Sequence, residues 1–252
     1  MINLHNHSTW SDGQYAPDQL VDMAIQSDLT HIGISDHFFT TKLFLDQAYV
    51  DVERLDAYID DLHRVAGVFA EQIQVLAGIE VDWSDRARPK FPALWDKIGS
   101  LDYVLFEYVE DRDWYGDSLE ALLTVRPSIP IPVGLAHNDL SRNMGPYYRV
   151  DELVSLLEEY DIFIELSTNP YTMYYKSSDA DNRQLWRALA KSKVRFSIGS
   201  DTHGFIADVG YVRDACSFLR ERGMIDRLIT NWWDPDHRVW KPYVRSADVK
   251  SV

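Results

Sequence analysis

The sequence predicts a mainly parallel α/β fold that closes, or nearly closes, into a barrel. One unit recurs along the 252 residues: a short apolar strand, a polar loop and an amphipathic helix. Such alternation is typical of a parallel sheet with helices outside it. Seven strands over about 200 residues fit a barrel better than an open sheet, although spacing alone does not separate the two. No linker or repeat divides the chain, so we expect a single domain over residues 1–252.

The candidate strands are short apolar runs bounded by polar or turn-forming residues. In chain order they are Ile2–Leu4, Ile32–Ser35, Val75–Ile79, Tyr103–Phe106, Val133–Ala136, Ile162–Leu166 and Arg195–Ile198. A helix is predicted over Pro17–Ser27, with proline in its first turn. A second is predicted over Asp151–Tyr160, which has one apolar face, and a third over Arg213–Arg222, which stops at Gly223.

The composition narrows the classes of partner. Twenty-five basic and forty acidic residues leave a formal charge of −15, so nonspecific binding to nucleic acid or to an anionic membrane is not expected. The single cysteine, Cys216, permits neither an intrachain disulfide nor a thiolate-rich zinc site, and its helical apolar surroundings indicate a buried core residue. The chain begins without a secretory leader, which favours a cytoplasmic location.

Candidate metal ligands end or follow the predicted strands. They are His5 and His7, Asp36 and His37, Glu80, Glu107, His137, and Asp201 with His203, while the sixth strand carries Glu165. Since the carboxyl ends of parallel strands form one face of a barrel, five of the eight histidines should converge on one rim. Scattered side chains would not give this pattern, so it indicates a metal site. Imidazole and carboxylate ligands without thiolate suit Zn, Mn or Fe.

The spacing within two pairs supports this interpretation. Residues two apart on a strand point the same way, so the imidazoles of His5 and His7 can reach one ion. Asp201 and His203 share that spacing, provided that the strand conformation continues through them. His31, His63 and His237 lie away from the strand ends, and for each we expect a structural or surface role.

Other catalytic motifs are missing from the sequence. Gly199-Ser200-Asp201 follows a strand but lacks the second glycine of a nucleophile elbow, and neither a P-loop nor a Gly-x-Gly-x-x-Gly fingerprint occurs. A reaction that uses metal-activated water is therefore favoured over one that uses a serine or cysteine nucleophile.

At this point the sequence resembles a known family, the PHP (polymerase and histidinol phosphatase) superfamily. The similar motifs are Leu4–Gly13, Ile34–His37, Gly78–Glu80, His137 and Gly199–His203, in the order that the family has them. They extend over about four-fifths of the chain, and the first and last are the specific ones. The resemblance implies a distorted (β/α)7 TIM-like barrel that holds up to three divalent metals and hydrolyses phosphate esters.

The resemblance also implies a ligand set. His5, His7, Glu80 and Asp201 would hold one metal, with Glu80 bridging to a second that also uses His137. Asp12, His37 and His203 would hold the third. The sequence departs from the family at the fourth strand, where a histidine is usual and Glu107 stands instead. We expect Glu107 to be the substitute ligand, with Glu110 as the alternative, and a carboxylate there shifts the preference somewhat toward Mn or Fe.

The function implied is hydrolysis of a small phosphomonoester, similar to histidinol phosphate or a nucleotide, by a metal-dependent phosphatase. Asp201 or His203 could assist proton transfer, and Arg142 and Lys176 are candidates to bind the phosphate, although each could equally be a solvated surface charge. Two alternatives stay open. One is an amidohydrolase-like metal-dependent hydrolase, which also begins with His-x-His, and the other is a non-catalytic metal-binding barrel.

Overall fold

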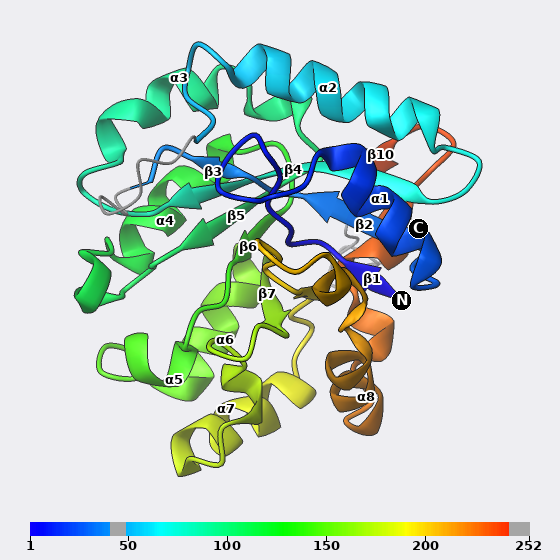
Figure 1. Ribbon diagram of the computed structural model, residues 1–252. Coiled ribbons are helices and arrows are strands. Elements are labelled where there is room, and N and C mark those ends of the chain that lie inside the picture. Colours follow the sequence, from blue (N-terminus) through cyan, green and yellow to red (C-terminus); the bar gives the residue numbers. More distant parts are fainter. Residues whose placement is uncertain (41–48, 242–252) are drawn as a thin grey trace, which may run out of the picture.

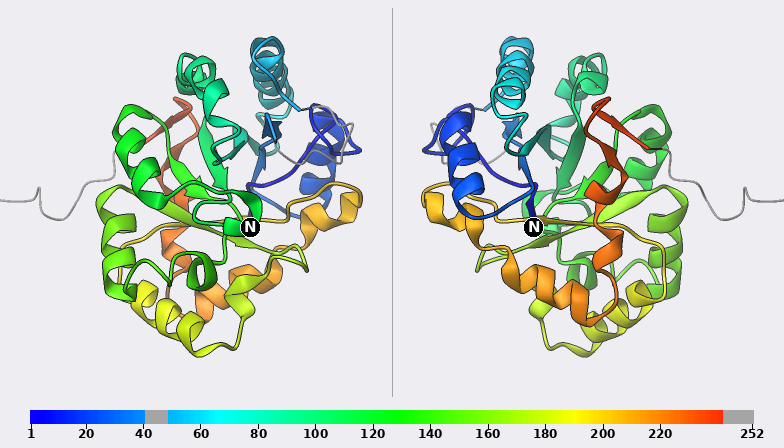
Figure 2. Two further views of the ribbon diagram at one scale, coloured as in Figure 1. Left: turned by 90° about the vertical axis from the view of Figure 1, so that its left-hand side faces the viewer. Right: turned by 90° about the vertical axis from the view of Figure 1, so that its right-hand side faces the viewer.

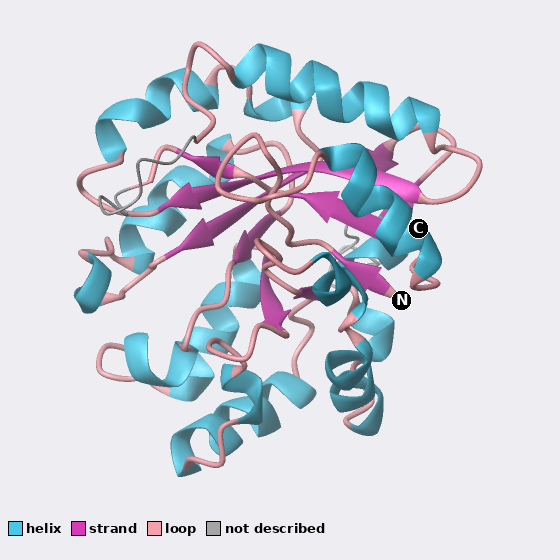
Figure 3. Ribbon diagram, viewed as in Figure 1, coloured by secondary structure: helices cyan, strands magenta, loops and turns pink. Residues whose placement is uncertain are grey.

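The computed structural model describes residues 1–40 and 49–241, and its centre is a parallel sheet that curls into a barrel (Figures 1 and 3). Seven strands lie side by side in the order β1 (Ile2–Asn3), β2 (His31–Ile34), β4 (Gln74–Asp82), β5 (Tyr103–Glu107), β6 (Val133–Leu135), β7 (Ile162–Ser167) and β8 (Phe196–Gly199). A further strand, β3 (His37–Phe38), pairs with the carboxyl-terminal half of β4. The predicted mainly parallel α/β fold is confirmed.

The two edge strands of this sheet, β1 and β8, meet near their carboxyl-terminal ends. The amide of Leu4 donates to the carbonyl of Ile198 at 2.7 Å, and the amide of His7 donates to the carbonyl of Thr202 at 2.9 Å. The amide of Asp201 donates to the carbonyl of His5, also at 2.9 Å. These bonds lie at and just beyond the ends of β1 and β8, so the sheet is a nearly closed, distorted TIM-type barrel.

Helices form a ring around the strands, as the two views of Figure 2 show. The α-helices are α1 (Pro17–Gln26), α2 (Leu55–Val68), α3 (Phe91–Trp95), α4 (Leu119–Val125), α5 (Leu140–Asn143), α6 (Val150–Glu159), α7 (Ala180–Ala190) and α8 (Arg213–Glu221). Short 3-10 helices cover Arg88–Lys90, Ile98–Ser100, Arg112–Trp114, Arg126–Ser128, Tyr174–Lys176, Ile206–Gly210, Ile225–Arg227 and Ile229–Trp232. The three predicted helices correspond to α1, α6 and α8 within one residue at each end. Within the described ranges, none of these helices has the length and apolarity that a membrane crossing requires.

Two details differ from the sequence-based prediction. β4 continues past Ile79 to Asp82, so Glu80 lies inside a strand and not at its end. The reason is that β4 has a hydrogen-bonded partner on each side there, β3 and β5, which no single-sequence pattern reveals. β1 is shorter than predicted, and it is followed by an isolated parallel bridge between Asn6 and Thr202.

Large aromatic side chains fill the barrel interior, and glycines on neighbouring strands make room for them. The Tyr103 hydroxyl crosses from β5 to donate to the carbonyl of Leu4 at 2.6 Å. A Cβ at Gly33 or Gly78 would lie 2.2 Å from atoms of Tyr103, and a Cβ at Gly134 would lie 2.1 Å from the ring of Phe163. Side chains in this interior are packed to the density of a protein core.

The amino-terminal end of the barrel is covered by the hairpin of β9 (Trp233–Asp234) and β10 (Val239–Trp240). The indole of Trp240 donates to the carbonyl of Asp102 at 2.6 Å, immediately before β5. The indole of Trp233 lies 3.4 Å from the Gln74 side chain at the start of β4. These tryptophans therefore complete the core at the end opposite the predicted ligands.

Candidate metal centre

The structure brings together all nine side chains of the ligand set that the family resemblance implies, with Glu107 at the fourth strand. They come from the loop after β1, from the start of β3, from β4 and the end of β5, and from the segments after β6 and β8, and they are His5, His7, Asp12, His37, Glu80, Glu107, His137, Asp201 and His203. Their ligand atoms form four overlapping groups in which all atoms lie within 4.8 Å of one another. The groups are His7, Asp12, His37 and His203; His5, His7 and Glu80; His5, His137 and Asp201; and His37, Glu80 and Glu107.

Glu80 lies at the centre of the cluster and is fully buried. Its carboxylate oxygens lie 2.9 Å from Nδ1 of His37 and 3.0 Å from Nε2 of His137. They lie 3.3 Å from Nε2 of His5 and 3.4 Å from Nε2 of His7. Neither oxygen of this buried group receives a well-formed hydrogen bond. A carboxylate surrounded by four imidazoles in this way suits bridging between divalent ions.

The distance between two ring nitrogens gives an independent test of whether metal ions fit here. Nε2 of His5 and Nε2 of His7 lie 3.0 Å apart in the interior. Zn–N bonds of about 2.0–2.1 Å in a tetrahedral site place two ligand nitrogens slightly more than 3 Å apart. The donor set and its spacing therefore fit a metal centre.

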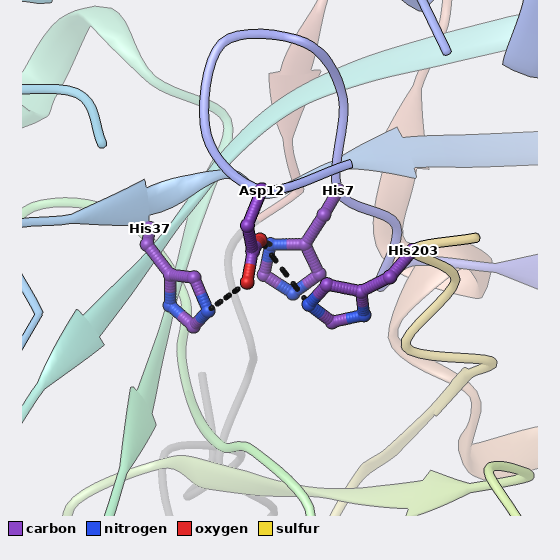
Figure 4. A group of neighbouring side chains, drawn as sticks. All are labelled: His7, Asp12, His37 and His203. Carbon is purple, nitrogen blue, oxygen red and sulfur yellow. Dashed lines mark ion pairs between the residues drawn. The ribbon is translucent and has the colours of Figure 1, made fainter. Parts of the chain in front are cut away.

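A second group surrounds Asp12, which reaches the cluster from the loop after β1 (Figure 4). Its Oδ1 lies 3.2 Å from Nε2 of His203 and 3.6 Å from Nδ1 of His7, while its Oδ2 lies 3.7 Å from Nε2 of His37. Figure 4 shows the carboxylate pointing into the space that these three imidazoles bound. Three histidines and one aspartate make a complete four-ligand set.

Asp201 lies between the ligands around Glu80 and the group around Asp12. Its Oδ1 lies 3.2 Å from Nε2 of His7 and 3.7 Å from Nε2 of His5, and its Oδ2 accepts a hydrogen bond of 3.0 Å from the Asn169 amide. The strand conformation does not continue through Asp201 and His203, because Asp201 has a left-handed φ of 53°. Both side chains nevertheless reach the cluster, since the turn at Asp201 aims them inward.

The fourth-strand position has two glutamates, and only one of them faces the cluster. Glu107 is fully buried, and its oxygens lie 3.5 Å from Nδ1 of His37 and 3.9 Å from Nε2 of His137. Glu110 instead accepts a 2.8 Å hydrogen bond from the amide of Leu119, at the first turn of α4. The geometry places Glu107 with His37 and Glu80, whereas the family resemblance grouped it with His137.

The electrostatics of the cluster reflect close packing of opposite charges. Burial alone would raise the pKa of Glu80, but His5 and His37 outweigh that effect and hold it well below its usual range. Burial would likewise raise the pKa of Asp201, and the hydrogen bond with His7 together with the nearby imidazoles lowers it. Both carboxylates are therefore ionised and available as ligands at neutral pH.

The pKa of His7 is lowered, whereas nearby carboxylates raise the pKa values of His5, His137 and His203. Burial, followed by the charges of His203 and His37, lowers the pKa of His7 to about 3, so it is neutral and able to ligate. At His137 and His203 burial opposes protonation, but Glu80 raises the pKa of His137 to about 9, and Asp12 and Asp201 raise that of His203 to about 9. A metal ion would have to displace those protons.

Arg142 and Lys176, the predicted phosphate-binding residues, each pair with an aspartate. The Arg142 guanidinium pairs with Asp113, and both side chains are about two-thirds exposed. The ammonium of Lys176 lies 2.7 Å from Asp214. Both side chains thus form ion pairs at the surface of this structure, and their contact with a substrate stays a prediction.

Two buried carboxylates that the sequence places at the predicted strands, Asp36 and Glu165, belong to none of the four ligand groups. Asp36 accepts four hydrogen bonds of 2.6–3.1 Å from the amides and hydroxyls of Ser8 and Ser11, which shapes the loop that carries Asp12. Glu165 accepts from Nδ1 of His5 at 3.0 Å. A sequence signal for Glu165 existed, because a single acid in an apolar strand must find a partner when buried.

Comparison with known proteins gives a family match. The model of the PHP domain family matches residues 3–228. Among curated proteins, the DNA polymerase/3'-5' exonuclease PolX of Bacillus subtilis is 24% identical over 207 residues, which are 80% of this chain and 34% of that protein. The chain thus spans about a third of the length of this relative.

Among solved structures, two similar ones are histidinol phosphatases by description. One from Lactococcus lactis, complexed with Zn, L-histidinol and phosphate, has a TM-score of 0.61 at 17% identity and covers 88% of this chain and 93% of its own. One from Listeria monocytogenes has a TM-score of 0.60 at 14% identity and covers 85% and 99%. At such identities the likeness establishes a shared fold.

Proposed function

Since this chain belongs to the PHP domain family, we propose that it is a metal-dependent phosphoesterase that hydrolyses a small phosphomonoester. The observation that carries the proposal is the cluster of five histidines and four carboxylates centred on Glu80, of which His5, His7, His37, Glu80 and Glu107 are buried. Nine ligands are more than one ion needs, so the cluster suits two or three ions, of which Zn, Mn and Fe fit its imidazole and carboxylate donors. Histidinol-phosphate-like and nucleotide-like esters are the substrates we propose.

The side chains of the cluster would have different roles in this reaction. His5, His7, Glu80, Asp201 and the other ligands would hold the ions, which when bound would supply an activated water and positive charge for the phosphoryl oxygens. The carboxylates Asp12, Glu80, Glu107 and Asp201 keep the site from becoming strongly cationic. We infer no protein nucleophile, because Cys216 is buried in α8, on the outside of the barrel.

His203 is the ligand best placed to exchange protons with solvent or with a leaving group. Its side chain is 33% exposed, whereas those of His5 and His7 are fully buried. Its Nδ1 lies 2.9 Å from the carbonyl of Asp201 and donates to it, which turns Nε2 toward Asp12. We therefore propose that Asp201 and His203 assist proton transfer in addition to binding metal.

The discriminating experiment measures metal content and activity together. The purified protein is stripped with chelator, reloaded with Mn or Zn, and assayed on p-nitrophenyl phosphate, on histidinol phosphate and on nucleoside monophosphates. We expect two or three ions per chain and hydrolysis that depends on them. Replacing Glu80 by Gln should remove metal and lower activity by more than about 100-fold, beyond what changes behind the ligands cost.

Other outcomes would select the alternatives. Hydrolysis of a cyclic amide or lactone without any phosphatase activity would identify an amidohydrolase-like enzyme. Stoichiometric metal with no hydrolysis of either class would identify a non-catalytic metal-binding barrel. A chain that binds no metal after reloading would contradict all three hypotheses.

A further inference from the structure

Glu165 connects two candidate ligands from different strands. Its two oxygens lie 3.1 and 3.0 Å from Nδ1 of His5, which follows β1. Its Oε2 also accepts the backbone N–H of His137, after β6, at 3.0 Å. Glu165 itself is in β7 and is 5% exposed. One buried carboxylate therefore contacts both histidines from behind, on the side away from Glu80.

The contact with His5 requires the side chain to pass over a neighbouring strand. β8 pairs with β7 on one side, and on its other side the barrel closes onto β1 through the bond from the Leu4 amide to the Ile198 carbonyl, so β8 lies between β7 and β1. At the crossing point stands Gly199, the last residue of β8, and a Cβ there would lie 2.1 Å from Oε1 of Glu165 and 2.4 Å from Cβ of His5. Any side chain at this position would push the carboxylate away. The glycine thus leaves the space through which Glu165 reaches His5.

The hydrogen bond determines which nitrogen of His5 can bind metal. A carboxylate beside Nδ1 holds the proton on that atom, so Nε2 keeps its lone pair. Nε2 is the atom that faces Glu80, His7 and Asp201. The second bond acts on the backbone, because His137 has a φ of 27°, which a non-glycine residue adopts only when its surroundings hold it there.

We propose that Glu165 is a positioning residue for the metal centre, which sets the tautomer of His5 and the backbone of His137, and that Gly199 is glycine to admit it. The claim rests on the metal-binding part of the proposed function and not on the substrate. Accordingly its test measures metal affinity and histidine protonation, so that a failure to hydrolyse phosphate esters would not affect it.

The first test uses variants. Glu165→Gln keeps the shape but removes the negative charge, and its NH2 group takes the place of one of the two oxygens that lie beside Nδ1 of His5. Gly199→Ala keeps the negative charge of Glu165 but pushes its carboxylate away from His5. We expect each to lower the affinity for zinc, measured by chelator competition, by about 10–100-fold. The matched control is Asp102→Asn, which alters another buried carboxylate that accepts a backbone N–H, from Ala77, at the far end of the barrel. It should leave zinc affinity unchanged.

The second test needs no variant. In the zinc-loaded protein, long-range ¹H–¹⁵N NMR should show His5 with a proton on Nδ1 and with Nε2 as the ligating nitrogen. A His5 that ligates through Nδ1, or carries its proton on Nε2, would overturn the proposal even if the variants fail to fold. Wild-type zinc affinity in a folded Glu165→Gln protein would overturn it as well.

Discussion

Glu107 is the residue on which the composition of the metal centre most depends. It stands where the family resemblance implies a histidine, and it is fully buried beside His37 and Glu80. A buried carboxylate is costly unless it is paired or bound to a cation. Its position suits a ligand that brings negative charge to the cluster and favours ions that accept oxygen ligands.

Replacing Glu107 by Gln should therefore lower metal content or affinity at one position, because an amide is a weaker and uncharged ligand. The measurement is elemental analysis after dialysis against limiting Mn or Zn. Glu110→Gln is the control, since it changes only the hydrogen bonds that Glu110 accepts from the Leu119 amide and the Tyr148 hydroxyl, each worth about 1 kcal/mol. Equal metal content in wild type and Glu107→Gln would remove Glu107 from the ligand set.

The histidines give the metal-free protein a pH-dependent stability. The pKa values of His137 and His203, each about 9, lie above the unfolded value of about 6.5. Their contribution to stability is complete below the unfolded pKa and is lost as the pH rises through about 9. We expect the unfolding midpoint in chelator to fall over this range, by roughly 2–4 °C for each kcal/mol lost. A midpoint that rises would contradict the assigned pKa directions.

At the scale of elements, the same strands build both the core and the site. Alternate residues of a strand face the interior. On β4, Gly78 therefore faces the core and Glu80, two residues later, faces the cluster. On β7, Phe163 and Glu165 are related in the same way. Beyond the strands the backbone turns sharply. Left-handed φ values of 65°, 27° and 53° occur at Tyr108, His137 and Asp201, immediately after β5, after β6 and after β8. Such strain concentrates where side chains must be aimed at a site.

Gly78→Ala tests this coupling of core and site. The new Cβ would meet Tyr103 at 2.2 Å, so we expect a loss of about 1–3 kcal/mol in the free energy of unfolding, measured in urea. Gly67→Ala is the control, because Gly67 lies in helix α2 with open space around its Cβ position and should gain roughly 0.4–1 kcal/mol. Equal effects of the two changes would mean that Tyr103 does not fill the interior as described.

At the scale of the whole molecule, metal and fold are linked. The ligands come from separate strands around the barrel, so ions bound to them tie together segments as distant in sequence as His5 and His203. The chain also carries a formal charge of −15, which bound cations partly offset. Anything that binds only the folded state stabilises it.

Removal of metal should consequently lower the thermal unfolding midpoint, and restoring Zn or Mn should raise it. An ion at about 1,000 times its Kd contributes roughly 4 kcal/mol, which is easily measured by calorimetry. In Glu80→Gln the gain on adding metal should be mostly lost. A midpoint that does not respond to metal in wild type would show that the cluster binds ions weakly or not at all.

The barrel and its ligand rim could be predicted from the sequence because both depend on local order. Short apolar runs alternate with amphipathic helices, and ligand-type residues such as His5, His137 and His203 follow the runs. Parallel strands necessarily gather their carboxyl ends on one face. The family motifs then matched the same positions, and the fold and all nine candidate ligands came together in the structure.

Tertiary structure alone decided which atoms meet. The choice of Glu107 over Glu110 depends on a turn that sends Glu110 to the amide of Leu119. The role proposed for Glu165 depends on the order β7–β8–β1 and on the missing side chain of Gly199 between them. A sequence records residue types and their spacing along one strand. Contacts across a closed barrel depend on which strands become neighbours, and this is settled only when the whole chain folds.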